Sequence, residues 1–192
     1  MSDLDAIVKE LTAYALENGA TGVKLIKPQD VVVAQWVRNK CQFGCRHYGK
    51  RFTCPPYAPT PAETAEILAD YNTALLVEFA NLQREKLKEP QWYNKIPKVL
   101  YEMERMAFLR GFQKAYCYKG GPCSLCAKCP AEELENPSLF HAKLCKQPKE
   151  ARPAMEAAGI DVYTTVRRAG FELHVVRERS DVFKTFGLVL LE

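Results

Sequence analysis

The chain has 192 residues, of which 47% are hydrophobic and 26% charged, and this balance is typical of one soluble globular domain over residues 1–192. The net charge of +4 is too small to indicate a nucleic-acid-binding protein. No apolar run approaches the roughly 18 residues of a membrane span, and the start lacks the basic-then-apolar pattern of an export signal, so we expect a cytoplasmic protein with no membrane and no nucleic-acid partner.

The first part of the chain is predicted to contain a helix and two strands before a long loop. Residues 2–20 carry apolar side chains at helical spacing, and Gly19 is suited to end that helix. Residues 21–28 and 30–37 are rich in β-branched side chains, and we expect both to be strands. The segment 39–61 contains repeated Gly and Pro and is expected to be a loop.

The clearest helix start of the sequence lies at Thr60. Thr60 is suited to cap the helix, Pro61 to fill its first position, and Glu63 to complete a capping box. We therefore expect a helix over residues 60–71. The apolar stretch 72–80 that follows predicts a buried strand.

The middle of the chain is charged and is expected to be mostly helical from residue 82 to residue 118. Pro90 and Pro97 are expected to break it, because proline removes a helix hydrogen bond and its ring clashes with the preceding turn. A long helix over residues 98–116 is then predicted, ending before a pair of glycines.

The last third is predicted to contain a short helix over residues 149–159, closed by Gly159, and two strands, 172–176 and 186–191. Helices and strands alternate without a regular strand–helix–strand rhythm. This favours an α+β fold, a mixed α/β sandwich in which helices pack on a mixed sheet. Two cysteine-rich segments lie in Gly- and Pro-rich loops, where proteins commonly present ligands, and we expect both loops to bind metal.

Four of the eight cysteines form what we call the second cysteine group: Cys123, Cys126, Cys129 and Cys145. Two-residue spacers allow three thiolates to converge on one cluster while a distant cysteine supplies the fourth ligand, as in bacterial ferredoxins. Cytosolic thiols stay reduced, and eight cysteines in 192 residues fall below the roughly 8–10% of disulfide scaffolds, so metal binding is favoured over disulfides. We expect a [4Fe–4S] cluster here.

The first cysteine group contains only three cysteines: Cys41, Cys45 and Cys54. Three thiolates on a four-iron cluster leave one iron open to another ligand or to a substrate. Three alternatives remain: Cys117 completes the set, Cys54 serves the second group, or His47 joins the three thiols in a zinc site. The sequence thus predicts one or two [4Fe–4S] clusters.

Zinc is the alternative metal for both groups. It favours two well-separated cysteine pairs, each spaced by two to four residues, so a compact triplet suits it less well. The second cysteine group still offers four sulfurs, and His141 offers a substitute ligand. His174 is expected in the middle of a strand, as a packed side chain and not as a ligand.

Basic residues are numerous around the second cysteine group. They offset the charge of a cluster, about −2 for four thiolates on a four-iron core, or they bind an acidic redox partner protein. A solvated basic surface is the simpler alternative. The residues are Lys119, Lys128, Lys143, Lys146, Lys149 and Arg152, with Arg167 and Arg168 further along the chain.

Short motifs surround the cysteines: Cys41-x3-Cys45, Tyr48-Gly49-Lys50, Cys54-Pro55-Pro56, Gly121-Pro122-Cys123-x2-Cys126-x2-Cys129 and Cys145-x2-Pro148. Together they resemble a family of predicted metal-binding proteins of unknown function, found largely in anaerobic bacteria and archaea. The resemblance covers residues 22–170 and implies metal binding by an iron–sulfur centre, without a settled activity. The chain departs from the family in a longer spacer before Cys145 and in Ala154, where serine is typical, and Cys117 is not part of the pattern.

Three functions are compatible with these residues. The first is electron transfer or other redox work by the clusters, with the basic surface binding an acidic partner. The second is an enzyme in which an open iron of the first cysteine group binds substrate, helped by the basic side chains of residues 46–51. The third is a zinc-binding structural or carrier protein. We expect the first, an iron–sulfur electron-transfer protein.

Overall fold

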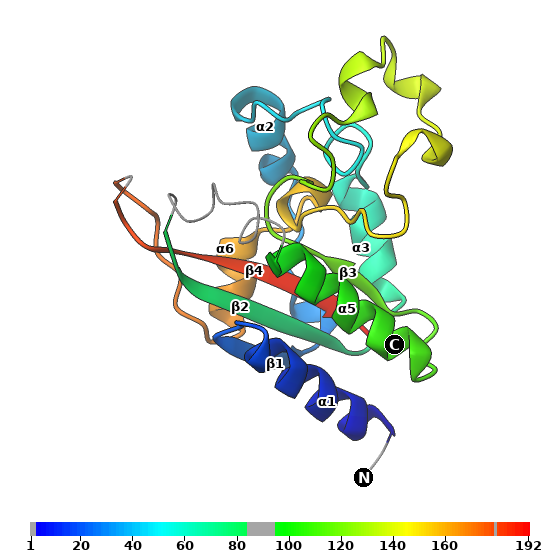
Figure 1. The fold of residues 1–192 in the computed structure, drawn as a ribbon. Helices are drawn as coiled ribbons and strands as arrows, with labels where there is room; N and C mark the ends of the chain where they lie inside the picture. Colours follow the sequence, from blue (N-terminus) through cyan, green and yellow to red (C-terminus); the bar gives the residue numbers. More distant parts are fainter. Residues whose placement is uncertain (1–2, 84–94, 179) are drawn as a thin grey trace.

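The computed structural model describes residues 3–83, 95–178 and 180–192. Within them, four strands form one sheet in the order β1-β2-β4-β3, and each neighbouring pair is antiparallel (Figure 1). The expected α+β fold, with helices packed on a sheet, is confirmed. An isolated parallel bridge joins Lys119 to Ala154 beyond the named strands. The strands are β1 (Gly22–Ile26), β2 (Ala74–Leu82), β3 (Tyr116–Tyr118) and β4 (Phe183–Leu190).

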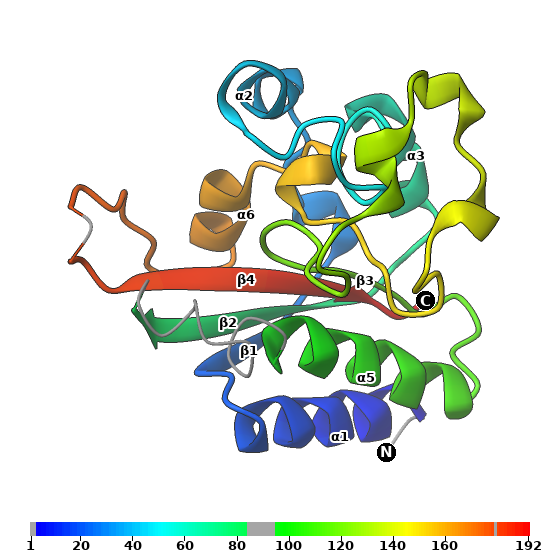
Figure 2. The same ribbon diagram turned by 45° about the horizontal axis from the view of Figure 1, so that its top comes forward.

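One face of the sheet is covered by two long helices, α1 (Asp3–Glu17) and α5 (Lys95–Leu109) (Figure 2). Because side chains alternate across a strand, every second residue of β2 and β4 points to this face. We call the two helices and the apolar side chains beneath them the α1/α5 layer. Its buried core includes Ile7, Leu11, Leu75, Val77, Phe79, Leu100, Met103 and Val189.

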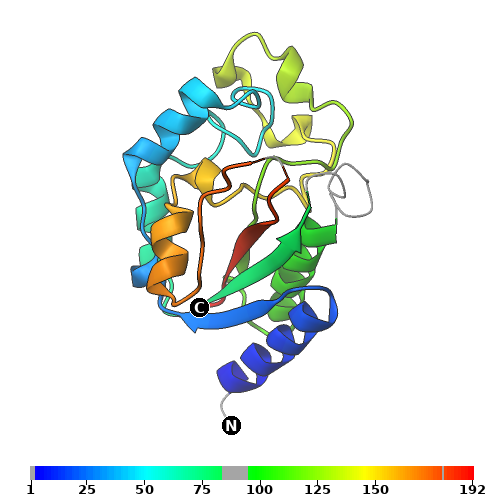
Figure 3. The same ribbon diagram turned by 90° about the vertical axis from the view of Figure 1, so that its left-hand side faces the viewer.

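The opposite face carries α3 (Pro61–Ala69), α6 (Val162–Arg168) and, beyond them, α2 (Gln35–Gly44). We call these helices, with residues 45–60 and 119–160, the cysteine-bearing layer. In all three views the loop after α2 lies beside the segment that follows β3, on the side of the sheet away from α1 and α5 (Figure 3). The core on this face includes Leu68, Leu76, Tyr118, Met155, Ile160, Val166, Leu188 and Leu190.

Several predicted elements are confirmed, namely the first helix, the strands at β1, β2 and β4, and the helix that begins after Thr60. The capping box forms as expected: Glu63 N donates to Thr60 Oγ1 at 3.3 Å, and Thr60 N donates to Glu63 Oε2 at 2.7 Å. Pro61 occupies the first turn, where its missing N–H has no helical partner to lose.

The predicted strand over residues 30–37 is wrong. It is a 3₁₀ turn, η1 (Pro28–Asp30), followed by an extended link and then by α2, which begins at Gln35. The link pairs with the chain around Gly159 instead of with the sheet, since Ala34 N donates to Gly159 O at 2.9 Å. Helix α2 continues to Gly44, so Cys41 lies on a helix, within the segment that was expected to be loop.

The prediction that Pro97 breaks the long helix is wrong. Pro97 lies in the first turn of α5. Proline is tolerated there, because the first N–H groups of a helix have no intrahelical partner. Pro90 lies outside the described residues. The helix ends at Leu109 and not at 116, with Gly111 at φ +95° just beyond it. Cys117 therefore lies on β3 and not at the end of a helix.

The end of the chain departs further from expectation. Only a 3₁₀ turn, η6 (Glu156–Ala158), forms in the predicted short helix, closed by Gly159 at φ +81°. The segment 172–176 is not a strand, and His174 is exposed instead of packed. Helix α6 was not expected; its cap is Asp161, whose Oδ1 accepts from Thr164 N at 3.0 Å. In the described part of the chain, no helix is both long and apolar enough to cross a membrane.

Candidate metal centre

The four thiols of the second cysteine group line one small cavity, although they come from two separate stretches of the chain. Arg51, Phe52 and Thr53, from the loop of the first cysteine group, form another part of its wall. Burial raises the pKa of the Cys145 thiol, and the three other thiols of the group raise it further. The structure therefore brings all four predicted ligands together.

The segment that carries this group leaves the sheet and returns to the same place. Lys119 N donates to Pro153 O at 3.0 Å, and Met155 N donates to Lys119 O at 2.8 Å. Gly120 begins the turn, and a Cβ there would lie 2.1 Å from the Thr185 hydroxyl oxygen. Because its base is closed, the segment brings Cys145 back beside the three closely spaced cysteines.

Glu104 of α5 braces both ends of this segment from below. Its Oε2 accepts from Cys117 N at 2.8 Å and from Arg152 Nε at 2.8 Å, and its Oε1 pairs with Arg152 Nη2. Both side chains are largely buried, with 10% of Glu104 and 15% of Arg152 exposed. Sequence reasoning missed Glu104, because no spacing in the chain relates it to the cysteines.

The longer spacer before Cys145 folds as three 3₁₀ turns: η3 (Pro130–Glu133), η4 (Pro137–Leu139) and η5 (Ala142–Leu144). Phe140, in this spacer, packs on Phe52 and Tyr57 of the first cysteine loop, with ring centroids 4.9 and 5.5 Å away. The extra residues thus contact the neighbouring loop and do not displace Cys145 from its group.

The first cysteine group spans the end of α2 and the loop after it. Cys41 and Cys45 are four residues apart, so they lie one turn apart at the end of α2. Burial raises the pKa of Cys54 to about 12, and the thiols of Cys45, Cys41 and Cys123 contribute to the increase. The three predicted members are therefore neighbours, and Cys54 also lies close to the second group. A bound cation reverses this effect, because a coordinating thiol loses its proton.

A larger cavity of about 280 Å³ opens beside the first cysteine group. Cys41 and Cys45 form one side of it, and Trp36, Lys40 and Glu156 are among its other walls. Burial raises the pKa of the Cys41 thiol, followed by the effects of Cys45 and Glu156. Glu156 is a second acidic residue that sequence reasoning missed. The cavity gives Cys41 and Cys45 an accessible side.

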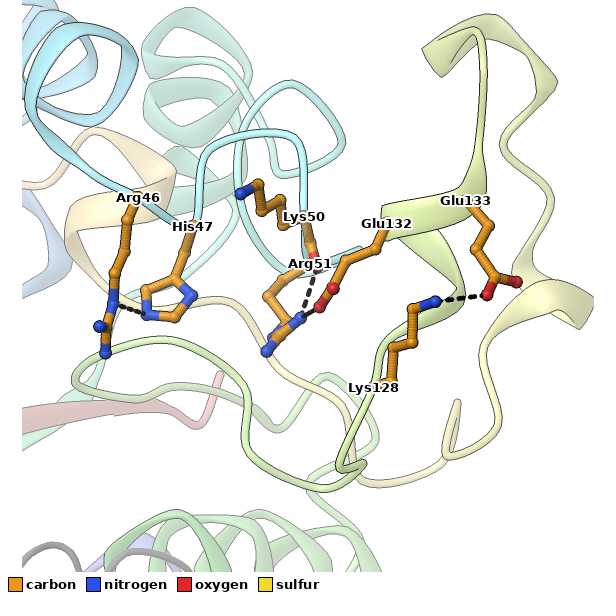
Figure 4. A network of polar contacts seen from close by, with 7 residues as sticks. All are labelled: Arg46, His47, Lys50, Arg51, Lys128, Glu132 and Glu133. Atoms are coloured by element: carbon orange, nitrogen blue, oxygen red, sulfur yellow. Dashed lines mark hydrogen bonds and ion pairs between the residues drawn. The ribbon is translucent and has the colours of Figure 1, made fainter.

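The two histidines proposed as ligands make other contacts. Arg46 Nε donates to His47 Nε2 at 3.2 Å (Figure 4). Burial and then the charges of Arg46, Arg51 and Lys50 lower the pKa of His47, which favours its neutral form. His141 is exposed, and its Nδ1 accepts from Lys143 N at 3.1 Å in a local turn.

Cys117 is separated from both groups by the sheet. It is 1% exposed and packs in the α1/α5 layer, whereas its neighbour Tyr118 faces the cysteine-bearing layer. Burial and then the Glu104 carboxylate raise the pKa of the Cys117 thiol far above its usual value. Its side chain lies on the face of the sheet away from both cysteine groups, so Cys117 belongs to neither of them.

Two of the basic residues expected around the second group are internal. Lys119 is 2% exposed, and Arg152 is paired with Glu104. Lys128 is exposed and pairs with Glu133 at 2.7 Å (Figure 4). The side chains that remain on the surface near Cys145 are Lys143, Lys146 and Lys149.

The four residues of the second cysteine group line one cavity, and Cys41 and Cys45 of the first group line another. Among the described residues, no three His, Cys, Asp or Glu side chains are close enough to share a single metal ion. All eight cysteines, every one of which the structure describes, are free thiols. Soft thiolates are the ligands that zinc, copper(I) and iron–sulfur clusters prefer, so the donor set fits a metal centre.

Residues 24–191 match the family model described as predicted metal-binding protein (DUF2284). The chain belongs to this family. The matched span contains both cysteine groups, so the resemblance drawn from the motifs is confirmed as far as the family and metal binding in general. No curated protein and no solved structure shows significant similarity to the chain.

Proposed function

We propose that the protein is an iron–sulfur protein that transfers electrons, with a [4Fe–4S] cluster on Cys123, Cys126, Cys129 and Cys145. The observation that carries the proposal is the cavity that these four thiols share. A cubane binds each thiolate through a different iron, so it needs sulfurs that stand apart around a common space. Zinc instead needs all four sulfurs at about 2.3 Å from one ion.

We place a second cluster on Cys41, Cys45 and Cys54. Its three thiols are neighbours, and the proximity of Cys54 to Cys123 supports two centres lying side by side, as electron transfer between them would require. Free thiols suit a reducing compartment, which supports a cytoplasmic location. The exposed lysines near Cys145 would attract an acidic redox partner protein.

Anaerobic purification followed by metal and sulfide analysis tests this function. We expect iron and acid-labile sulfide in equal amounts and a visible absorption band that bleaches on reduction. Replacing Cys126 by serine should remove the cluster of the second group, whereas Cys117→Ala, across the sheet, should leave iron and sulfide unchanged. Stoichiometric zinc without sulfide would overturn the proposal in favour of a structural or carrier zinc protein.

A second function is favoured by the cavity of about 280 Å³ beside Cys41 and Cys45. With only three thiolates, a cluster there keeps one iron free for a small molecule, and the protein would then be an enzyme. Adding small anions to the reduced protein tests this. If the anions change the paramagnetic spectrum and Cys45→Ser abolishes that change, the result supports the enzyme. If the spectrum is unchanged, electron transfer remains the proposed function.

A further inference from the structure

Arg51 belongs to the loop of the first cysteine group but lines the cavity of the second. Its side chain is 15% exposed. Burial lowers the pKa of Arg51, whereas the Glu132 carboxylate and, more weakly, the nearby thiols of Cys129 and Cys123 raise it. Arg51 and Lys146 are the cationic residues among those that line this cavity, and of the two only Arg51 is largely buried.

The hydrogen bonds of Arg51 account for only one part of its guanidinium. Nη1 donates to Lys50 O at 2.8 Å and pairs with the Glu132 carboxylate (Figure 4). Nε is fully buried and has no hydrogen-bond partner within the residues described. A buried N–H of a charged group is costly when unpaired, so such a donor indicates an acceptor that is absent from the protein chain itself.

Thr53 shows a second buried donor on the same wall. It is 7% exposed and lines the same cavity as Arg51. Its Oγ1 lies close enough to the Cys54 thiol to lower the pKa of that thiol, yet no hydrogen bond of normal geometry forms in the described structure. Two unpaired donors on one thiol-lined cavity favour an anionic acceptor inside it.

We propose that Arg51 Nε–H, with the Thr53 hydroxyl, donates a hydrogen bond to sulfur of the cluster held by the second cysteine group and raises its reduction potential. The inference rests on the proposed iron–sulfur function. Reduction by a one-electron donor adds one negative charge to the cluster, and a fixed cation beside it stabilises that charge. Glu132 of η3 holds Arg51 in place through their ion pair.

The ion pair with Glu132 explains how Arg51 is held in position. Glu132 lies three residues after Cys129, and its ion pair with Arg51 joins the second cysteine segment to the first. The ion pair engages Nη1 and leaves the buried Nε without a partner among the described residues. The pairing of Lys128 with Glu133, on the same segment, is exposed on both sides, at 62% and 68%, and offers a matched control.

The test measures the reduction potential of the anaerobically prepared protein by a redox titration followed by electron paramagnetic resonance. Arg51→Gln should lower the reduction equilibrium constant at least about tenfold, which is about 59 mV for a one-electron couple. Lys128→Gln removes an exposed charge from the same segment and should change it less than about twofold. Equal shifts in the two variants would show that the reduction potential responds only to the net charge, and this result would overturn the proposal.

A spectroscopic signature distinguishes a hydrogen bond from a distant charge. In protein labelled with guanidino-¹⁵N arginine, the reduced cluster should show a ¹⁵N hyperfine coupling. Arg51→Lys keeps the positive charge but lacks Nε, so the coupling should disappear in it while iron and sulfide stay. If Arg51→Gln loses its cluster, Arg51→Lys still tests the proposal. A ¹⁵N coupling that persists in Arg51→Lys overturns it.

Failure of this inference is distinct from failure of the proposed function. A wild-type protein without iron and sulfide removes both. A wild-type protein that holds its cluster, with potentials and hyperfine couplings unchanged in the Arg51 variants, overturns the role of Arg51 alone.

Discussion

The two faces of the sheet are built on different principles. The α1/α5 layer consists of two long helices that bury an almost entirely apolar core against β2 and β4. The cysteine-bearing layer consists of short helices, 3₁₀ turns and loops whose thiols line cavities. Burial of apolar surface is sufficient to explain the first layer. The second layer also has an apolar core against the sheet, but its cysteine loops rely on backbone bridges, a few ion pairs and, in our proposal, a bound cluster.

This difference predicts which part of the protein loses stability when the metal is removed. A ligand that binds only the folded state stabilises it, and the stabilisation is concentrated in the part of the protein that holds the ligand. The α1/α5 layer has no thiol except Cys117, which is buried away from both groups. The two layers are therefore expected to respond differently to the same treatment.

Removal of the metal should produce the largest effect. After chelation under reducing conditions, amide hydrogen exchange in residues 119–155 should accelerate at least about a hundredfold, as expected for a site well saturated with its ligand. Exchange in α1 and α5 should stay within a few-fold of that in the loaded protein. A uniform acceleration of exchange across both layers would contradict the expected difference between them.

Glu104 connects the two layers, and its removal should destabilise both. Glu104→Gln leaves Arg152 largely buried without its counterion, and we expect a loss of about 3 kcal/mol in the free energy of unfolding. Urea denaturation measures it. Glu102→Gln on the same helix removes an exposed pair with Arg105 at 3.5 Å and should cost less than about 1 kcal/mol. Equal losses would show that Glu104 has no bracing role.

Overpacking the α1/α5 layer should affect stability without affecting metal content. A Cβ at Gly187 of β4 would lie 2.3 Å from Leu100 Cδ1 of α5, so Gly187→Ala should destabilise by about 2 kcal/mol. A Cβ at Gly44 has nothing within 4 Å, so Gly44→Ala should leave the free energy of unfolding nearly unchanged or slightly higher. Loss of iron from a folded Gly187→Ala protein would contradict the separation of the layers.

The cap of α3 should give the smallest effect. Thr60→Ala removes the side-chain oxygen that accepts from Glu63 N, and we expect a loss of about 1 kcal/mol in thermal or urea unfolding. Hydrogen bonds from the Thr60 backbone and hydroxyl lower the pKa of Glu63. The stabilisation from these hydrogen bonds is therefore present above the ordinary carboxyl pKa. It is lost as the pH falls through the lowered pKa of Glu63. A variant with an unchanged pH dependence would exclude this cap.

The sequence predicted the α1/α5 layer well, because its signals are local and repeated. Helical spacing of apolar residues predicted α1, and the apolar stretch 72–80 predicted the buried strand observed as β2. The layer beyond it was predicted less well, since its conformation depends on distant partners. Ala34, for example, donates to Gly159, and nothing near residue 34 reveals that contact.

Cysteine spacing predicted the members of the candidate site. In the structure the four residues of the second group line one cavity, and Cys54 lies near the thiols of both groups. The surrounding residues could not be predicted in the same way. Arg51 stands in the motif of the first group but lines the cavity of the second. Cys117 lies only six residues before Cys123, yet strand alternation turns it to the other face. Such placements depend on where loops meet.

Mössbauer spectroscopy of the anaerobically purified, ⁵⁷Fe-labelled wild-type protein tests the central claim most directly. We predict the spectra of [4Fe–4S] clusters, with about one iron in eight distinct from the rest, because seven cysteines serve two four-iron clusters. The distinct iron belongs to the first cysteine group and should be absent from the second. Spectra of single iron ions bound by four thiolates, or no bound iron beside one equivalent of zinc, would contradict the account.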